Sequence, residues 1–266
     1  MPDGLTGRVA IVTGAGGAVG GAIATRLLEA GAQVMLADDG EAQLAPMMKA
    51  LEAHGSRVGR FHHRKHDKLG AANLMAATLD AFDRVDILVN TPRATEPGAL
   101  AELDAASLSQ ALEQNVTSAF LLSQAVAKRI AQQPREDMPD GGAILNVSSI
   151  AAQRTVPELL AYSVSCAALD QLTRSMAADL AADRIRVNAI ALGAVMTERM
   201  RELLRERSEL RAELVQVTPL RRIGEAEEAA EAALFLCSPR ASFITGQVLA
   251  VDGGRLVLDP LASPDR

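Results

Sequence analysis

The chain has 266 residues, 48% of them hydrophobic and 2% aromatic, with no tryptophan and a formal net charge of −6. This length and apolar fraction suit one large α/β domain, whereas the acidic, aromatic-poor composition argues against nucleic acid or a membrane surface as partner. Two cysteines without a metal or disulfide pattern, no secretory leader pattern and no apolar run of membrane-spanning length predict a cytoplasmic protein.

Short apolar runs alternate with helical patterns from the start of the chain. A buried strand at Val9–Thr13 leads into a glycine-rich turn and a helix over about 19–30, and a second strand follows at Gln33–Ala37. A helix near 41–54 then precedes a polar strand near 57–63. Further strand patterns follow at 86–90, 143–147, 184–190 and 247–251.

This alternation predicts an α/β fold with a parallel sheet, right-handed crossovers and helices on both faces. We find no repeat and no linker, so we expect a single doubly wound Rossmann-type domain over residues 1–266. The polar segment 132–142, which contains two prolines, is expected to be a surface loop.

The glycine-rich turn predicts a phosphate site. It lies where the first strand meets the first helix, so that backbone N–H groups and the positive end of the helix dipole would face a pyrophosphate. A turn also needs glycine for its own conformation, so the cluster alone is weak evidence. The candidate cofactor-binding residues here are Thr13, Gly14, Gly17, Ala18, Val19 and Gly20.

An acidic residue follows the second strand, about twenty positions after the glycine turn. Asp38 would accept hydrogen bonds from the adenosine ribose, and a carboxylate there would repel a 2′-phosphate, which favours NAD over NADP. Asp39 is the neighbouring alternative, and a solvated loop acid is the simplest explanation for either.

All four histidines fall between His54 and His66, among several arginines and lysines. His62, His63 and His66 could suggest a metal site, but the acidic or thiol ligands that would complete one are missing nearby, apart from Asp67. We therefore predict a solvated basic edge and no metal.

Taken together, the motifs resemble the classical short-chain dehydrogenase/reductase family over about residues 7–254, with 255–266 as a C-terminal tail. The resemblance rests on the Thr13–Gly20 turn, the strand ending at Asn90, Asn115 in Asn-Val-Thr-Ser, Asn146-Val-Ser-Ser149 and Tyr162. Further matches are Arg186–Gly193, Thr197, Pro219–Gly224, Thr245-Gly-Gln247 and Val251–Gly254.

The resemblance implies hydride transfer between NAD and a small-molecule alcohol or carbonyl. In this family Ser149 would orient the substrate oxygen, Tyr162 would transfer the proton and Asn115 would hold a relay water. Asn90, Gly193 and Thr197 would join the cofactor site. A tyrosine hydroxyl has an ordinary pKa near ~10, and the family lowers it with a lysine one helical turn later.

The sequence departs from the family pattern at several of these positions. Cys166 stands where the family has the catalytic lysine, which predicts a degenerate active site. Ala18 replaces a glycine of the turn, Arg64 replaces the aspartate that reads adenine, and Leu192 replaces a proline. Thr91, Pro92 and Arg93 replace Asn-Ala-Gly beside the cofactor channel, so these changes put NAD binding in question.

Three interpretations stay open at this stage. The chain is an NAD-dependent alcohol or carbonyl oxidoreductase of reduced activity, in which Arg93 or Arg154 replaces the missing cation. Alternatively, it is an inactive nucleotide-binding sensor or structural partner subunit. Thirdly, Cys166 is a nucleophile or redox switch, for which a small apolar filling role is the simpler account.

The resemblance also implies assembly and a lid. Family members form homotetramers or homodimers through two long helices, expected here at about 104–130 and 160–182. The charged segment 196–216 predicts a helical lid over the substrate, and the substrate itself is not indicated.

Overall fold

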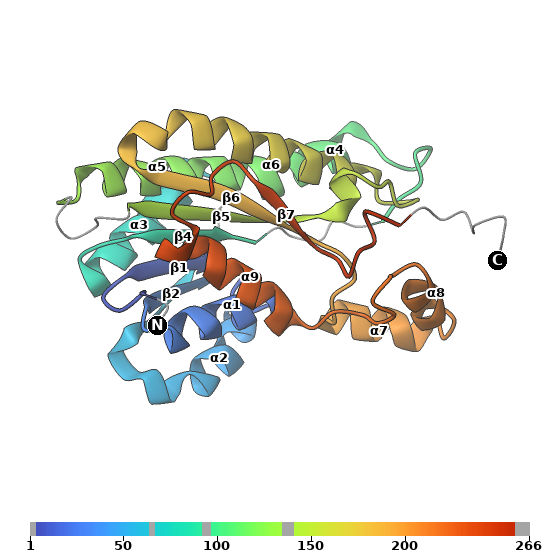
Figure 1. Ribbon diagram of the computed structural model, residues 1–266, viewed down its shortest axis with the longest axis horizontal. Coiled ribbons are helices and arrows are strands. Elements are labelled where there is room, and N and C mark those ends of the chain that lie inside the picture. The colour runs from blue at the N-terminus through green and yellow to red at the C-terminus, as the bar shows by residue number, and fades with distance from the viewer. Residues whose placement is uncertain (1–3, 64–66, 92–96, 135–140, 259–266) are drawn as a thin grey trace.

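The computed structural model describes residues 4–63, 67–91, 97–134 and 141–258 (Figure 1). Within these ranges, seven strands form one parallel sheet in the order β3-β2-β1-β4-β5-β6-β7. The strands are β1 (Val9–Thr13), β2 (Gln33–Asp38), β3 (Val58–His62), β4 (Ile87–Asn90), β5 (Gly142–Ser149), β6 (Ile185–Leu192) and β7 (Val248–Val251). The strand order reverses between β1 and β4, which is where such folds bind ligands.

Helices cover both faces of the sheet (Figure 1). One face carries α1 (Ala18–Glu29), α2 (Glu41–Ala50) and α9 (Ala226–Cys237). The opposite face carries α3 (Lys68–Phe82), α5 (Ser118–Gln132) and α6 (Leu160–Asp179), with α4 (Ala105–Leu112) packed against α6. The prediction of a doubly wound Rossmann-type fold is confirmed.

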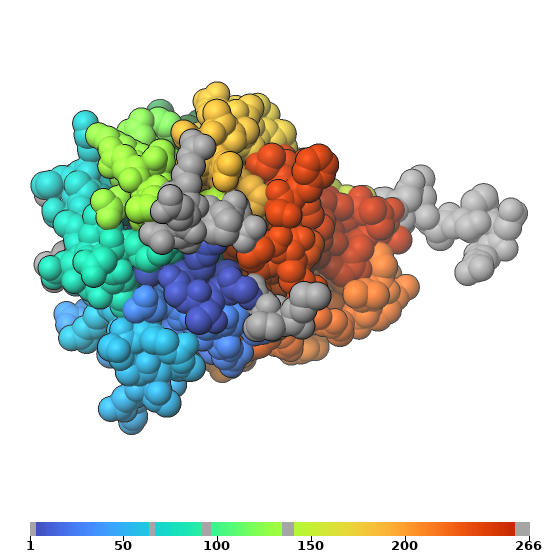
Figure 2. Space-filling model, turned by 60° about the vertical axis from the view of Figure 1, so that its left-hand side comes forward, coloured from blue at the N-terminus to red at the C-terminus, as the bar shows by residue number. Residues whose placement is uncertain are grey.

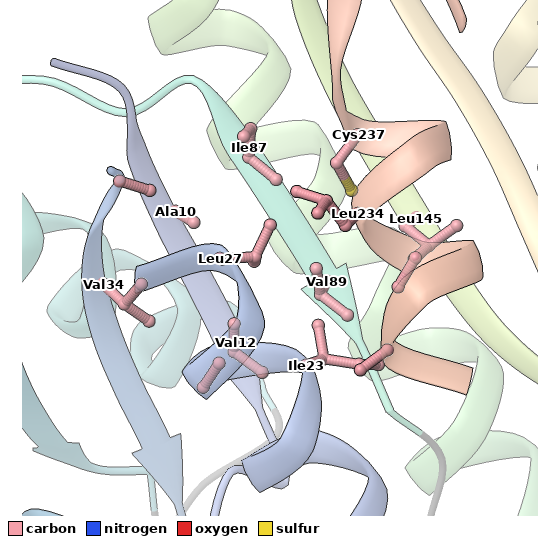
Figure 3. Close-up of a cluster of buried hydrophobic side chains, with 14 of the residues drawn as sticks. Ala10, Val12, Ile23, Leu27, Val34, Ile87, Val89, Leu145, Leu234 and Cys237 are labelled. Atoms are coloured by element: carbon pink, nitrogen blue, oxygen red, sulfur yellow. The ribbon is translucent and has the colours of Figure 1, made fainter. Parts of the chain in front are cut away.

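The core on the α1 side is built from small aliphatic side chains. Ala10 and Val12 of β1, Ile23 and Leu27 of α1, and Leu234 of α9 converge there and are almost fully buried (Figure 3). Since β1 and β4 are covered on both faces, their sequences are continuous apolar runs without alternation. This rigid centre fixes the ends of the strands, where polar side chains gather.

The first and last helical layers meet. Contacts between α1 and α9 are among the most extensive in the molecule, and the space-filling view shows the blue N-terminal segments beside the red segments near α9 (Figure 2). The N-terminal nucleotide-type half and the C-terminal half are therefore parts of one packed unit.

Two helical boundaries differ from the prediction. The helix expected over 41–54 ends at Ala50 and is followed by a 3₁₀ segment, Glu52–Arg57, in which Gly55 has a positive φ of 58°. The long helix expected over 104–130 is interrupted by a π-helical turn at Glu113–Thr117. Apolar periodicity does not reveal either break, because both arise from local hydrogen bonding.

The predicted lid is helical, as expected. It consists of α7 (Glu198–Glu206) and α8 (Leu210–Gln216), which lie beside the main body at the end of the sheet (Figure 1). Neither helix has a fully buried residue, so the lid is held by few core contacts. Across the described ranges, no helix combines the length and apolar character needed to cross a membrane.

Candidate active site

A cavity of about 560 Å³ opens at the carboxyl ends of β1, β2 and β4. Its walls contain every predicted cofactor residue except one: Thr13, Gly14, Gly17, Ala18, Val19, Gly20, Asp38, Asn90 and Thr197. The exception is Gly193, which packs against the turn that follows β7. A Cβ added to Gly193 would lie 2.7 Å from the Cα of Asp252 in that turn. Gly193 thus permits a close backbone approach there and does not line the cavity.

The glycine turn is shaped by two positions. Gly14 has a positive φ of 61°, and a Cβ added at Gly20 would lie 2.2 Å from the Gly14 carbonyl oxygen. Helix α1 begins at Ala18 after Gly17, which offers its first turn no side-chain cap. The helix therefore presents backbone N–H groups and the positive end of its dipole at the cavity, an arrangement suited to a phosphate.

Ala18 does not disrupt this turn. Gly17 and Ala18 are both exposed at the cavity, so the Ala18 methyl group points into open space. Gly16 and Gly17, which precede Ala18, add no side chain beside a bound phosphate. The residues present fit a dinucleotide pyrophosphate.

Asp38 ends β2 and faces the glycine turn. Its Oδ2 accepts a hydrogen bond from the Gly16 N–H at 3.0 Å, and its Oδ1 accepts one from the Gly40 N–H at 3.3 Å. The carboxylate is thereby fixed beside the pyrophosphate position, where ribose hydroxyls would donate to it. Asp39 also lines the cavity, but Asp38 has the defined geometry.

Thr91 joins the ends of β1 and β4. Its N–H donates to the Thr13 Oγ1 at 3.0 Å, and its hydroxyl donates to the Thr13 carbonyl oxygen. The Asn90 side chain donates from its amide nitrogen to Ser123 and Asn146, so that nitrogen is engaged within the protein. The other departures at this end, Arg64, Pro92 and Arg93, lie outside the described residues.

The prediction of a solvated basic edge is wrong for one of the histidines. His63 is only 5% exposed and lines the cavity beside Asp38, whose carbonyl oxygen accepts a hydrogen bond from the His63 N–H at 2.7 Å as the β2–β3 pairing continues. Gln43, which packs against Gly16, also lines the cavity and was not predicted. Among the residues that the structure describes, no three His, Cys, Asp or Glu side chains are grouped as metal ligands.

Asn115 is carried by the π-helical turn between α4 and α5. It is 2% exposed, lines the cavity, and donates from Nδ2 to the Ser165 Oγ at 3.0 Å. The Ser165 hydroxyl in turn donates to the Tyr162 carbonyl oxygen at 2.8 Å. Such a turn commonly occurs at functional sites, and here it links the cavity wall to the helix that carries Tyr162.

Ser149, Tyr162 and Cys166 meet next to this cavity without lining it. Ser149 ends β5, whereas Tyr162 and Cys166 lie one turn apart on α6, so both side chains face the strand end. The Tyr162 phenol is within hydrogen-bonding reach of the Ser149 hydroxyl and the Cys166 thiol. The three residues that the family resemblance named at this site therefore lie together.

Burial dominates the electrostatics of this cluster. It raises the pKa of the Tyr162 phenol well above its ordinary value, the Cys166 thiol adds to that increase, and the Ser149 hydroxyl opposes it. Burial also raises the pKa of Cys166, to about 11, so this thiol is neutral near pH 7. Both side chains therefore hold their protons.

Asp170 lies one turn beyond Cys166 on the same face of α6 and is 4% exposed. Its carboxyl group lies beside the Ser148 hydroxyl, and burial raises its pKa. Asp170 was not predicted from the sequence, although its spacing from Tyr162 and Cys166 places all three in one column.

Arg154 does not reach the tyrosine. Its guanidinium donates to the carbonyl oxygens of Leu256 at 3.0 Å and Leu258 at 2.6 Å, so it ties the loop after β5 to the chain beyond β7. Cys237 is buried in the α9 core, and burial raises its pKa to about 12, which makes it a structural thiol.

The fold and this arrangement define a dinucleotide-binding α/β domain in which a serine–tyrosine pair adjoins the cofactor cavity. The family model described as enoyl-(acyl carrier protein) reductase matches residues 14–255. The chain belongs to the short-chain dehydrogenase/reductase family.

Two relatives and one solved structure illustrate the similarity. The chain is 35% identical over 250 residues to 7alpha-hydroxysteroid dehydrogenase of Escherichia coli K12, covering 94% of each chain. It is 36% identical over 255 residues to galactitol 2-dehydrogenase (L-tagatose-forming) of Cereibacter sphaeroides, covering 95% of this chain and 96% of the relative. A structure of 7 alpha-hydroxysteroid dehydrogenase with NADH and 7-oxo glycochenodeoxycholic acid aligns with a TM-score of 0.87 at 34% identity, covering 95% and 96%.

Proposed function

We propose that the protein is an NAD(H)-dependent oxidoreductase that interconverts a small-molecule alcohol and its carbonyl compound. The observation that carries the proposal is the placement of Ser149 and Tyr162 beside a cavity that contains both the capless start of α1 and the Asp38 carboxylate. NADH is present in the structure of the hydroxysteroid dehydrogenase relative, which supports the same cofactor here.

The described residues suggest how such a cofactor would be held. The first turn of α1 would bind the pyrophosphate, Asp38 the ribose hydroxyls, and Thr197, which caps α7 through its hydroxyl at 3.1 Å from the Met200 N, would close the cavity from the lid side. When bound, NAD(H) would supply the hydride acceptor or donor. A 2′-phosphate beside the Asp38 carboxylate would be repelled.

The protein's own residues would handle the substrate oxygen and its proton. The Ser149 hydroxyl orients the oxygen. The Tyr162 hydroxyl donates a proton to a forming alkoxide in reduction, and the Tyr162 phenolate accepts one from the alcohol in oxidation. Tyr162 is protonated near neutral pH and so carries the proton that carbonyl reduction needs, although its raised pKa makes it a weaker acid than an ordinary phenol. Alcohol oxidation requires the phenolate, which is scarce there.

We infer further that Cys166 takes the position of the family's lysine, so that the active site is atypical. This is supported by its place one helical turn after Tyr162, its contact with the phenol and its complete burial. A neutral thiol cannot stabilise a phenolate as an ammonium does. The raised pKa favours a second candidate function, an inactive nucleotide-binding subunit that retains the fold.

Titration with NADH, followed by nicotinamide fluorescence with NADPH as a control, tests the first proposal. We expect saturable binding with NADH preferred, followed by turnover in a screen of ketones and secondary alcohols. Binding without turnover of any substrate would favour the inactive subunit, and no binding at millimolar cofactor would overturn the nucleotide site.

Assembly and location extend the proposal. We propose a homotetramer or homodimer that pairs through α4–α5 and α6, supported by the large exposed apolar side chains Phe120 on α5 and Val164 on α6. We also propose a cytoplasmic location, which the free cysteines Cys166 and Cys237 support. Sedimentation of the purified protein tests the assembly, and a monomer at micromolar concentration would contradict it.

A further inference from the structure

The charges that line the cavity are unbalanced. Arg199 is the only lysine or arginine among the described residues that form its wall. The same wall carries three carboxylates, those of Asp38, Asp39 and Glu198. Cys166, which on the proposed function takes the lysine position, is neutral near pH 7 and adds no cation. A dinucleotide would bring the two negative charges of its pyrophosphate into this wall, and Arg199 is the described side chain that can offset them.

Arg199 lies in the first turn of the lid. Thr197, Glu198 and Arg199 are consecutive wall residues at the start of α7, and the glycine turn before α1 forms another part of the same wall. The beginnings of the two helices therefore border one cavity. The lid carries its cation to the cavity in which the pyrophosphate would lie.

The Arg199 guanidinium is held only weakly by its neighbours. Its Nη1 donates to the Glu202 Oε2 at 3.4 Å, and the two side chains are 58% and 46% exposed. An exposed ion pair of this kind contributes little to stability, because water screens it and both side chains lose conformational freedom. Glu202 does not line the cavity. The guanidinium can therefore exchange this carboxylate for a phosphate without breaking a buried contact.

Arginine is chemically suited to that exchange. Its planar guanidinium donates two parallel N–H groups to a phosphate, and it is less strongly hydrated than an ammonium group. A pyrophosphate carries two negative charges close together, whereas Glu202 carries one. The attraction to the pyrophosphate is therefore the stronger of the two at equal distance.

We propose that Arg199 binds the pyrophosphate of the cofactor in place of its ion pair with Glu202. The inference rests on the proposed NAD(H)-dependent function and adds a cofactor-binding residue from the lid. In this arrangement the positive charge of the site comes from α7, whereas the lysine position on α6 is occupied by the neutral Cys166.

The test compares Arg199→Gln, Arg199→Lys, Glu202→Gln and Arg207→Gln with the wild type. Arg207 is the matched control, since it is similarly exposed, pairs with Glu209 and Glu213 and does not line the cavity. NADH is titrated by nicotinamide fluorescence at low and high salt. ADP-ribose, which has the same pyrophosphate but no nicotinamide, is titrated by displacement of NADH.

We expect Arg199→Gln to weaken the binding of both probes roughly tenfold, the range of one hydrogen bond to a charged group. The dependence of NADH affinity on salt should become shallower, because a cation directed at phosphate is lost. Arg199→Lys should recover part of the affinity. Glu202→Gln should bind NADH as tightly as the wild type or up to about twofold more tightly, and Arg207→Gln should match the wild type.

The outcomes separate the two proposals. A wild type that binds neither probe overturns the proposed function together with this inference. If the wild type binds NADH, equal losses in Arg199→Gln and Glu202→Gln overturn the inference alone, because the ion pair would then act by holding the lid. An unchanged affinity in Arg199→Gln, a loss confined to NADH, or an equal loss in Arg207→Gln also overturns it. Thermal unfolding of each variant verifies that the fold is intact.

Discussion

The nucleotide end of the cavity and the catalytic cluster beside it rely on different kinds of interaction. At the nucleotide end, the groups that would bind the cofactor are mostly backbone N–H groups after β1, with the Asp38 carboxylate fixed by two backbone hydrogen bonds. In the catalytic cluster, the proposed proton transfer would depend on the Tyr162 phenol, whose neighbours among the described residues, the Ser149 hydroxyl and the Cys166 thiol, are neutral. Backbone N–H groups stay in place when a side chain is replaced. The positive charge of a lysine beside Tyr162, by contrast, is lost when a neutral residue takes its position.

This contrast explains why some departures from the family pattern leave the site intact while others change its chemistry. Ala18 is exposed at the cavity, so it leaves the turn intact. Cys166 instead alters the charge beside Tyr162 in a buried place, where electrostatic interactions are strong. The catalytic cluster is therefore where activity would be lost or gained.

The largest effect should come from removing the proton donor. Tyr162→Phe keeps the ring but deletes the hydroxyl, and we expect turnover to fall roughly 10²–10⁴-fold, the usual contribution of an acid–base group. NADH affinity should change little because the phenol does not line the cavity. Steady-state kinetics with the best ketone and an NADH titration measure both values, and unchanged turnover would place the chemistry elsewhere.

Restoring the cation should have the next largest effect. Cys166→Lys would place an ammonium about 4–5 Å from the phenolate. The attraction between the two charges is roughly 3–4 kcal/mol at an effective dielectric of about 20. The rate of alcohol oxidation at pH 7 should therefore rise by at most about 10²–10³-fold. The buried Asp170 carboxyl one turn away can compensate the new charge.

Two variants control this experiment. Cys166→Ala removes the thiol without adding charge and should give no comparable gain. The double variant Cys166→Lys with Asp170→Asn should gain less than Cys166→Lys alone, since the ammonium loses its buried counter-charge. If Cys166→Ala raised the rate of alcohol oxidation as much as Cys166→Lys does, the cause would be obstruction of the site by the thiol, and the absence of a positive charge would not explain the low rate.

The pH dependence should differ between the two reaction directions. Because the folded-state pKa of Tyr162 lies above its ordinary value, the phenolate fraction rises about tenfold per pH unit throughout the neutral and mildly alkaline range. Alcohol oxidation should follow that slope from about pH 7 to 9, while carbonyl reduction stays nearly flat. A plateau in oxidation below the ordinary tyrosine pKa would show that a cation outside the described residues acts on the phenol.

The smallest effect concerns cofactor choice at the nucleotide end. Asp38→Asn keeps the side-chain shape but removes the charge, so the preference for NADH over NADPH should narrow by roughly tenfold. Asp39→Asn is the matched control, since Asp39 lines the same cavity without the hydrogen bonds that fix Asp38. Paired titrations decide between the two acids, and a larger effect for Asp39 would reassign the ribose contact.

Local sequence patterns predicted the features that depend on neighbours along the chain. Strand periodicity and the glycine turn located the sheet and the phosphate end, and helical spacing brought Tyr162 and Cys166 onto one face. The burial of His63 was missed because it depends on the pairing of β3 with the distant strand β2, where Asp38 aligns with His62. Gly193 lies outside the cavity wall, in tight contact with Asp252 on a distant segment, and its role in cofactor binding stays a prediction.

The π-helical turn at Glu113–Thr117 also fixes the number of residues between α4 and α5. Its wider hydrogen bond, from the Ser118 N–H to the Glu113 carbonyl oxygen, inserts one residue between α4 and α5, and each residue of an α-helix turns the chain by about 100°. Deleting one residue here would leave a regular helix, but would swing either α4 or α5 off its packing face and turn Asn115 from the cavity. This stretch should therefore reject single-residue deletions that surface loops of the same protein accept.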